Sequence, residues 1–319
     1  MLVARDVRVH FPIQEGILRR TVGHVRAVDG VSLQVERGKT LGLVGESGCG
    51  KSTLAKALMQ LVSMTSGTVS LDGLLLDAGN TQQLRAYRRR VQMVFQDPAE
   101  SLNSRHTLGE ILAEPMDIHT IGDAASRVAM VQQLLSDVGL VNTPLTRYPH
   151  EFSGGQRQRI GIARALALKP DFLICDEPVS ALDVSVQAQI LNLIMDLQDD
   201  RGVGVMMISH DLSVIRHVSH TVGVMYLGHM MEYASAEHIF AHAAHPYTRA
   251  LLDALPRPDP RLRHRPRTRL VGDLPSASDP PSGCPFQTRC PQVSGRCREE
   301  RPLFRELAPS HWIACHHVD

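Results

Sequence analysis

Apolar residues along the first 240 positions form two kinds of run that alternate with each other. Short, mostly apolar runs, bounded by glycine, proline or polar residues, predict buried strands. These runs lie at 41–44, 91–95, 172–175, 204–208 and 222–227. Between them, apolar positions recur every three or four residues, as on one face of a helix. Strands that alternate with helices predict an α/β core with a mostly parallel sheet.

The helical pattern is densest at 104–168, which we expect to be a helical subdomain inserted into the sheet-forming chain. Gly139 is placed to end one of its helices. The apolar stripe of that helix consists of Val128, Val131, Leu134, Leu135 and Val138. Residues 1–45 instead predict short strands, two of them joined by a turn at Asp29 and Gly30.

The composition changes after residue 243. Residues 245–248 are predicted to begin a short helix at 249–255, after which prolines interrupt every longer element. Four of the six cysteines fall in this part. The sequence therefore predicts a core at 1–243 and a loop-rich C-terminal extension at 244–319.

Composition and charge exclude several classes of protein. The 319 residues are 43% hydrophobic, which is typical of a packed chain and not of a disordered one. The net charge of +1 gives no basic field for nucleic acid, and we interpret the arginines at 88–90 and 257–269 as solvated faces or subunit contacts. Since there is no 18-residue apolar run and no signal-peptide pattern, we expect neither a membrane span nor export. We expect the chain to work in the cytosol, where thiols stay reduced.

Residues 45–53 carry the strongest chemical signal. They fit the pattern G-x-x-x-x-G-K-[ST] between a predicted strand and a helix predicted at 51–62, which is the context of a phosphate-binding loop. Glycines let backbone N–H groups face a phosphate, and the helix N-terminus adds its positive end. Lys51 is predicted to reach the β- and γ-phosphates, and Ser52 to bind Mg²⁺. The predicted phosphate-binding residues are Gly45, Glu46, Ser47, Gly48, Cys49, Gly50, Lys51, Ser52 and Thr53.

Two acids follow the strand predicted at 172–175. Asp176 can orient Mg²⁺ at the strand end. Glu177, one residue further on, can accept a proton from an attacking water. Taken alone, the two acids fit a hydrolytic site and two surface acids at a strand exit equally well.

A second anion site is predicted at the start of the helical run 157–168. Ser153 is a natural helix cap, and Gly154, Gly155 and Gln156 follow it. Their free N–H groups can face an anion. Because no lysine belongs to this set, we expect it to contribute to a nucleotide that is held mostly elsewhere.

The order of these motifs resembles the ATP-binding subunit of ABC transporters. Besides the motifs above, the resemblance rests on Gln96 and on the sequences at 180–183 and 209–211, and it covers about residues 1–240. It implies a P-loop NTPase of the ABC ATPase type with a mixed β core. Phe152 stands where the family usually has leucine. This exchange of one apolar anchor for another should leave the backbone of the second anion site intact.

The resemblance implies a catalytic set in which Glu177 is the general base. Gln96 would contact Mg²⁺ and the attacking water, and His210 would contact the γ-phosphate. The Mg²⁺ ligands would be Ser52, Gln96 and Asp176.

The resemblance also implies how ATP and a partner subunit are held. Phe11 would stack on adenine, although tyrosine is commoner there. Ser153, Gly154, Gly155 and Gln156 would bind ATP held by the partner subunit, and Asp183 would lie at the interface. Two subunits in head-to-tail arrangement would complete both sites, so that ATP joins them and hydrolysis releases them.

The partners implied by the resemblance are other transporter subunits. We expect a second ABC ATPase subunit, a non-identical homologue, and two transmembrane permease subunits, with an external solute-binding protein acting indirectly. The chain would then lie peripherally on the cytoplasmic face of the membrane.

The C-terminal extension is similar to that of oligopeptide and dipeptide importer ATPases, as residues 245–252, 272–276 and 280–286 indicate. The implied function is ATP hydrolysis that powers peptide import, and nickel and glutathione importers are related alternatives. A soluble ABC ATPase acting on nucleic acid is disfavoured by the single cassette, the neutral charge and the lack of a heptad run. A regulatory module with a degenerate ATP site is disfavoured because the predicted catalytic residues are intact.

The extension carries Cys284, Cys290, Cys297 and Cys315, separated by five, six and seventeen residues. Four thiols in a segment with few core residues suggest a metal that staples it. The close cysteine pair typical of zinc sites is absent from the sequence. We prefer a structural 4Fe–4S cluster, which the importer resemblance also implies; Zn²⁺ and free or disulfide-linked thiols remain alternatives. The nearby histidines could replace a ligand, but we expect them to be exposed; they are His311, His316 and His317.

Overall fold

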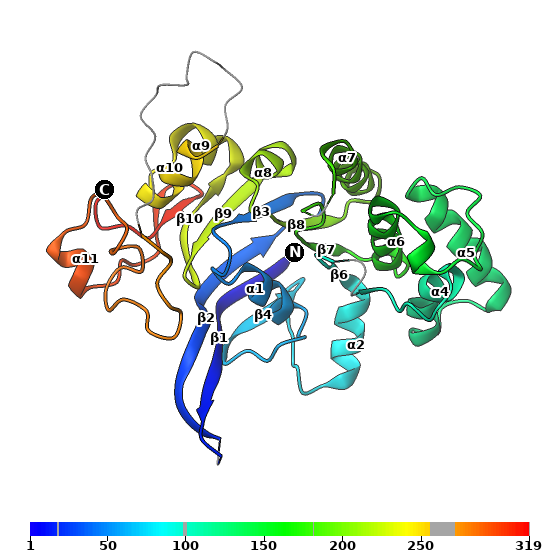
Figure 1. The fold of residues 1–319 in the computed structure, drawn as a ribbon, viewed down its shortest axis with the longest axis horizontal. Coiled ribbons are helices and arrows are strands. Elements are labelled where there is room, and N and C mark those ends of the chain that lie inside the picture. The colour runs from blue at the N-terminus through cyan, green and yellow to red at the C-terminus, as the bar shows by residue number, and fades with distance from the viewer. Residues whose placement is uncertain (18, 98–100, 181, 256–271, 319) are drawn as a thin grey trace. The chain divides into compact units, whose positions relative to one another are not determined.

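The structure is a computed structural model that describes residues 1–17, 19–97, 101–180, 182–255 and 272–318 (Figure 1). The chain divides into two compact units. Unit 1 consists of Met1–Leu2, Val35–Lys39 and Leu71–Ile208. Unit 2 consists of Val3–Gln34, Thr40–Ser70 and Ser209–Asp319. The arginine-rich segment at 257–269 lies outside the described residues.

Unit 1 is built on three parallel strands, β6 (Val91–Val94), β7 (Phe172–Asp176) and β8 (Gly204–Ile208). β7 pairs with the other two, with Val91 opposite Phe172 and Phe172 opposite Gly204. Every residue of β7 and β8 is buried, as expected for parallel strands covered on both faces. The apolar runs at 91–95, 172–175 and 204–208 therefore formed the strands that they predicted.

The helical subdomain of unit 1 consists of α4 (Leu108–Ile118), α5 (Ala124–Asp137) and α6 (Gly154–Leu166), which pack against one another (Figure 1). Gly139 follows the end of α5 with a φ of 71°, which confirms the predicted helix stop. The predicted stripe was one turn too long, since Val128 is 49% exposed. The remaining elements of unit 1 are β5 (Leu74–Leu75), α2 (Thr81–Arg90), η1 (Pro149–Glu151) and α7 (Val184–Arg201).

The larger sheet of unit 2 has the strand order β3-β9-β10-β12-β11. β3 and β9 are parallel, and the remaining pairs are antiparallel, which makes the core mixed. The strands are β3 (Thr40–Val44), β9 (Thr221–Tyr226), β10 (His229–Ser235), β11 (Arg305–Ala308) and β12 (His311–Ile313). The last two come from the C-terminal extension, so this part of the chain contributes to the sheet as well as to loops.

The smaller sheet of unit 2 has the order β2-β1-β4, with β1 (Leu2–Glu15), β2 (Arg20–Val35) and β4 (Ser66–Leu71). The helices of this unit are α1 (Lys51–Leu58), α8 (Leu212–Val218), α9 (Ala236–His242), α10 (Pro246–Asp253) and α11 (Gly295–Glu299). α10 begins at Pro246, within the residues 245–248 that were predicted to begin it, because the ring nitrogen of His245 accepts a hydrogen bond from Tyr247 N and caps the helix.

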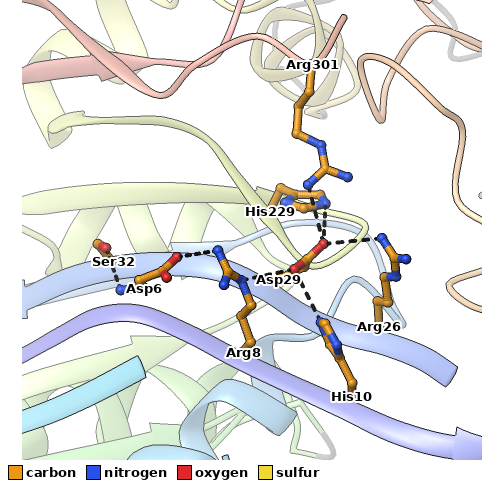
Figure 2. A network of polar contacts seen from close by, with 8 residues as sticks. All are labelled: Asp6, Arg8, His10, Arg26, Asp29, Ser32, His229 and Arg301. Atoms are coloured by element: carbon orange, nitrogen blue, oxygen red, sulfur yellow. Dashed lines mark hydrogen bonds and ion pairs between the residues drawn. The ribbon is translucent and has the colours of Figure 1, made fainter. Parts of the chain in front are cut away.

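The predicted turn at Asp29 and Gly30 is wrong, because β2 runs through both residues. Asp29 N donates to the carbonyl of Gly228 at 2.8 Å, and the Asp29 carboxylate lies at the centre of a network of arginine and histidine side chains (Figure 2). Its ion-pair partners are Arg8, His10, Arg26, His229 and Arg301. Although burial raises the pKa of Asp29, the charges of its neighbours lower it overall. The dipeptide therefore ties β1, β2, β10 and the extension together instead of reversing the chain.

Candidate functional site

The loop at 45–53 connects β3 to α1, and its shape requires glycine at two positions. Gly45 has a φ of 153° and Gly50 a φ of 104°. A Cβ on Gly45 would lie 2.2 Å from Met225 O, and one on Gly50 would lie 2.1 Å from Ala27 O. Backbone packs directly against this loop, so a side chain at either position would displace it. The loop leads into the N-terminus of α1, where unpaired N–H groups favour an anion.

Lys51 brings a cation to the same loop. Its Nζ donates to the carbonyls of Gly45 at 2.8 Å and Glu46 at 3.0 Å, and the residue is 5% exposed. Ser52 and Thr53 follow in the first turn of α1. Cys49 is fully buried, and burial raises the pKa of its thiol, so it fills space in the loop. The arrangement can bind a polyanion by backbone N–H groups and one ammonium group.

Two residues that support this loop were not predicted as site residues. Tyr247 Oη accepts a hydrogen bond from Glu46 N at 2.9 Å, and the Arg289 guanidinium pairs with the Glu46 carboxylate. Both residues come from the C-terminal extension, more than 200 positions away in sequence. Such distant pairs leave no periodic or local signal that sequence analysis could have used.

In unit 1 the acids at the end of β7 lie as predicted. Asp176 is the last residue of the strand and is 4% exposed. Glu177 is partly exposed with a φ of 46°, and its N–H donates to Ile208 O at 3.0 Å. Gln96 Nε2 donates to Glu177 Oε2 at 3.2 Å. The structure thus brings Gln96 and Glu177 together, and a partly exposed carboxylate beside an amide can take a proton from water.

The residues predicted to form the second anion site lie together in unit 1. Ser153 caps α6: its Oγ accepts from Gln156 N at 3.4 Å, while Gln156 Oε1 accepts from Ser153 N at 3.0 Å. Phe152 is 4% exposed and lies under the Arg147 guanidinium, 4.3 Å from the ring centroid, so it anchors the helix start from below. A hollow of about 350 Å³ opens here, lined by Ser153, Gly154, Gly155, Gln156, Arg159, Leu182, Asp183, Val186 and Gln189. Asp183 and residues 153–156, predicted separately, therefore line one hollow.

Phe11 and His210 lie in unit 2 with the loop at 45–53. Phe11 is in β1 with 39% of its surface exposed. His210 is exposed just before α8, whose cap Asp211 accepts from Ser213 N at 2.7 Å. The predicted site residues therefore form two sets, with the phosphate-binding loop, Phe11 and His210 in unit 2 and the acids, Gln96 and the second anion site in unit 1.

The oxygen donors predicted for Mg²⁺ suit this hard cation, because Ser52, Asp176 and Gln96 offer a hydroxyl, a carboxylate and an amide oxygen. The four cysteines of the extension present a different picture. Among the described residues, no group of three or more His, Cys, Asp or Glu side chains is arranged to hold a metal ion. The predicted 4Fe–4S cluster, and its Zn²⁺ alternative, therefore have no ligand set in this structure.

The four thiols are nevertheless near one another. The pKa of Cys284 is raised to about 11, mainly by burial and in smaller part by the charges of the other three cysteines. Cys297 Sγ lies 3.3 Å from Ser294 Oγ and 3.5 Å from His317 Nε2. All six cysteines of the chain are free thiols in the structure.

The prediction that His311 is exposed is wrong. His311 is 4% exposed, and its Nε2 lies 2.9 Å from Oε1 of Glu232, which is fully buried. Glu232 also accepts hydrogen bonds from the backbone N–H groups of Ala244 and His245. His311 belongs to β12, so pairing of that strand with β10 draws the ring inward. Of the other two histidines, His317 is exposed and His316 is partly buried.

Comparison with known proteins agrees with this geometry. Residues 28–180 match the family described as "ABC transporter", and residues 231–297 match the family described as "Oligopeptide/dipeptide transporter, C-terminal region". The oligopeptide transport ATP-binding protein AppF of Bacillus subtilis (strain 168) is 50% identical over 318 residues, which cover 99% of this chain and 97% of AppF.

Solved structures give the same result for the fold. The ATP-binding cassette MJ0796, solved as a dimer bound to ADP and Pi, has a TM-score of 0.66 and 26% identity; the match covers 74% of this chain and 99% of that one. The cbiO1 protein of Clostridium perfringens has a TM-score of 0.62 and 24% identity, with 75% and 92% covered. Within the described part of the chain, no helix has the length and apolar character needed to cross a membrane. This chain belongs to the ABC transporter family as an ATP-binding, ATP-hydrolysing subunit of its oligopeptide/dipeptide group.

Proposed function

We propose that this chain powers the import of di- or oligopeptides across the cytoplasmic membrane. The observation that carries the proposal is the 50% identity to AppF over nearly the whole of both chains, with the C-terminal extension included. That protein is named for oligopeptide transport, and the extension matches a region described for oligopeptide and dipeptide transporters. Because the likeness is not confined to the ATPase core, it favours peptides over the solutes of other importers.

For ATP binding, we assign the phosphate groups to residues 45–53 and the adenine ring to Phe11. The support is the glycine-dependent shape of the loop and the position of Lys51 on its carbonyls. His210 would contact the γ-phosphate. Mg²⁺, held by Ser52, Asp176 and Gln96, would supply positive charge to the phosphate oxygens.

For hydrolysis, we assign the general base to Glu177. The support is its partial exposure and the hydrogen bond from Gln96, whose amide can orient a water beside the carboxylate. Proton transfer from that water to Glu177 would accompany attack on the γ-phosphate. In this scheme Gln96 would contact the attacking water and would also be a ligand of Mg²⁺.

For assembly, we propose a dimer in which residues 153–156 bind ATP held by the facing subunit, with Asp183 at the interface. The second anion site has helix N–H groups but includes no lysine, so it suits a nucleotide bound mainly by another chain. MJ0796 was solved as a dimer with ADP and Pi. We further propose that the second ATPase is a non-identical homologue and that the complex contains two membrane permeases, with an external solute-binding protein acting indirectly. The chain would lie peripherally on the cytoplasmic face of the membrane. We also propose that the ATPase domain ends at residue 243 and that the importer-specific extension begins at residue 244.

For the four cysteines, the 4Fe–4S cluster stays a prediction, and Zn²⁺ its alternative. Its support is the mutual electrostatic influence of the thiols within the extension; the arrangement of their side chains does not form a ligand set. No step of hydrolysis depends on such a group. Iron, zinc and acid-labile sulfide should be measured per chain after purification without oxygen. About four iron and four sulfide per chain would support the cluster, and none of the three would identify free thiols.

Transport of peptide is the decisive test. The full complex, with its permeases and partner ATPase, should be placed in lipid vesicles together with the solute-binding protein and ATP. Labelled di- or oligopeptide should accumulate inside, and the Glu177→Gln variant should abolish accumulation. ATP hydrolysis stimulated by nickel or glutathione, with no response to peptides, would contradict the proposal.

A further inference from the structure

Two residues of the C-terminal extension contact Glu46 of the phosphate-binding loop, one at its side chain and one at its backbone. The Arg289 guanidinium forms two parallel contacts with the Glu46 carboxylate, Nη1 to Oε2 at 2.5 Å and Nη2 to Oε1 at 3.0 Å. Tyr247 Oη accepts from Glu46 N at 2.9 Å. Both the side chain and the backbone of Glu46 are thus held by groups from residues beyond 243.

The ion pair is largely removed from water. The Arg289 side chain is 7% exposed and that of Glu46 is 28% exposed. Hydrogen bonding to Glu46 raises the pKa of Arg289, so its charge is permanent. A bidentate guanidinium–carboxylate pair is directional as well as strong, and removal of one member leaves the other charge uncompensated. The orientation of the Glu46 side chain therefore depends on Arg289.

An aromatic cluster fixes Arg289 itself. Tyr226, Tyr247 and Phe286 are fully buried and meet edge to face, with ring centroids 4.8 to 5.3 Å apart. Arg289 N donates to Phe286 O at 3.1 Å, and its guanidinium lies 5.9 Å from the Tyr226 ring centroid. The packed aromatic rings therefore restrict the conformation of the Arg289 side chain and direct its guanidinium toward Glu46.

Glu46 in turn positions the groups that face a phosphate. Its carbonyl accepts from Lys51 Nζ at 3.0 Å and from Cys49 N at 3.2 Å. Leu274 Cδ2 lies 3.9 Å from the point where a Cβ would stand on Gly48, so the extension meets the loop at a further point. An unpaired Glu46 carboxylate in the same loop would repel a polyanion. Neutralisation by Arg289 removes that repulsion.

We propose that Arg289 is a positioning residue for ATP binding: it neutralises and orients Glu46, so that Lys51 and the loop amides are presented to the triphosphate. The C-terminal extension is then part of the nucleotide site as well as of the transporter-specific region. This inference rests on the assignment of ATP to residues 45–53 made above.

The test is a binding titration of the full chain with a fluorescent ATP analogue, together with KM and kcat for ATP. Arg289→Met should weaken binding about tenfold and raise KM alike, because a buried charge loses its partner. The kcat at saturating ATP should stay within about twofold, since no group touching the reacting atoms is altered. Arg289→Lys should recover part of the affinity. Arg296→Met, which removes an exposed pair with Glu300 in the same extension, is the matched control and should bind normally.

A double-mutant cycle separates positioning from general support of the fold. In the Glu46→Gln background there is no carboxylate to neutralise, so Arg289→Met should weaken binding less than about threefold. An equal loss in both backgrounds, or a normal Kd for Arg289→Met, overturns the proposal. If Arg289→Met does not fold, Arg289→Lys in the two backgrounds gives the same comparison. Failure of the wild-type chain to bind the analogue would instead refute the assignment of ATP to residues 45–53.

Discussion

The two proposed anion-binding sites of this chain both lie at helix N-termini, but they are held in shape by different means. The loop at 45–53 depends on glycines packed against backbone, carries Lys51, and is supported from a distance by Arg289. The site at 153–156 depends on a local exchange of hydrogen bonds between Ser153 and Gln156 and opens into a hollow. The loop at 45–53 brings the cation Lys51 to a phosphate, whereas residues 153–156 themselves offer only neutral donors. This asymmetry explains why one nucleotide would need both.

The largest effect is expected where hydrolysis is stopped while both sites stay intact. Glu177→Gln should lower ATP turnover about 10²–10⁴-fold, the usual contribution of a general base, and should leave ATP affinity unchanged. With ATP uncleaved, chains should accumulate as ATP-bound dimers, measurable by light scattering after size exclusion. Asp200→Asn, on the exposed side of α7, is the control. Phosphate release at the normal rate would contradict the assignment of the base.

The next largest effect is expected from removal of Lys51, the cation that the loop at 45–53 has and residues 153–156 lack. Lys51→Met should weaken ATP binding to the isolated chain about 100-fold, because a buried cation that meets the phosphates is lost. Lys56→Met changes an exposed lysine of the same helix and should bind ATP normally. Isothermal titration of ATP measures both. Equal affinity in the two variants would mean that residues 45–53 are not the main phosphate site.

Acid should destabilise the unit that carries the phosphate-binding loop. Burial lowers the pKa of His245 to about 3, so this ring is neutral in the folded chain and protonated in the unfolded chain between that value and about 6.5. The unfolded state binds more protons there, so stability falls as the pH drops below about 6.5, by about 2 kcal/mol at pH 5. His229, with a pKa lowered to about 4 mainly by burial, acts in the same direction.

This pH dependence can be assigned by substitution. His245→Gln should flatten the loss of thermal midpoint between pH 7 and pH 5, whereas the exposed His217→Gln should not. Differential scanning calorimetry at four pH values gives the slope for each variant. A wild-type midpoint that is constant over this range would show that protonation of these histidines is not linked to folding.

The smallest effect tests the second site. Ser153→Ala removes a helix cap and should cost about 1 kcal/mol of stability, with no change in ATP affinity of the isolated chain. Turnover of the assembled dimer should still fall, because the facing nucleotide loses a donor. Ser136→Ala, on the exposed side of α5, is the matched control. A loss of ATP affinity as large as that of Lys51→Met would remove the distinction between the two sites.

Sequence analysis was most successful where function depends on adjacent residues. Gly45, Gly50 and Lys51 belong to one loop, so their spacing alone predicts its glycine-dependent shape. The reciprocal cap of Ser153 and Gln156 is equally local. The acids at 176–177 were predicted as a pair because a buried strand ends at Asp176.

Sequence patterns gave no correct prediction where a residue acts through partners that are distant in the sequence. Asp29 and Gly30 have the composition of a turn, yet the basic side chains around Asp29 come from β1, β10 and the extension, which no local rule contains. Arg289 stands 243 positions from Glu46. β11 and β12 have four and three residues, too few to show a period of two. Tertiary pairing decided each of these cases.

The pairing of β12 with β10 has a practical meaning for work with shortened chains. Ile313 stands opposite Glu232, and only a four-residue strand follows at the border of this sheet. A fragment that stops before His311 would expose the backbone hydrogen-bonding groups of β10. It would also remove the imidazole of His311 that contacts the buried Glu232. Bare strand backbone recruits other chains. Aggregation of such a fragment would therefore indicate that the edge of β10 is exposed. The last nine residues should be kept in every expressed form of the protein.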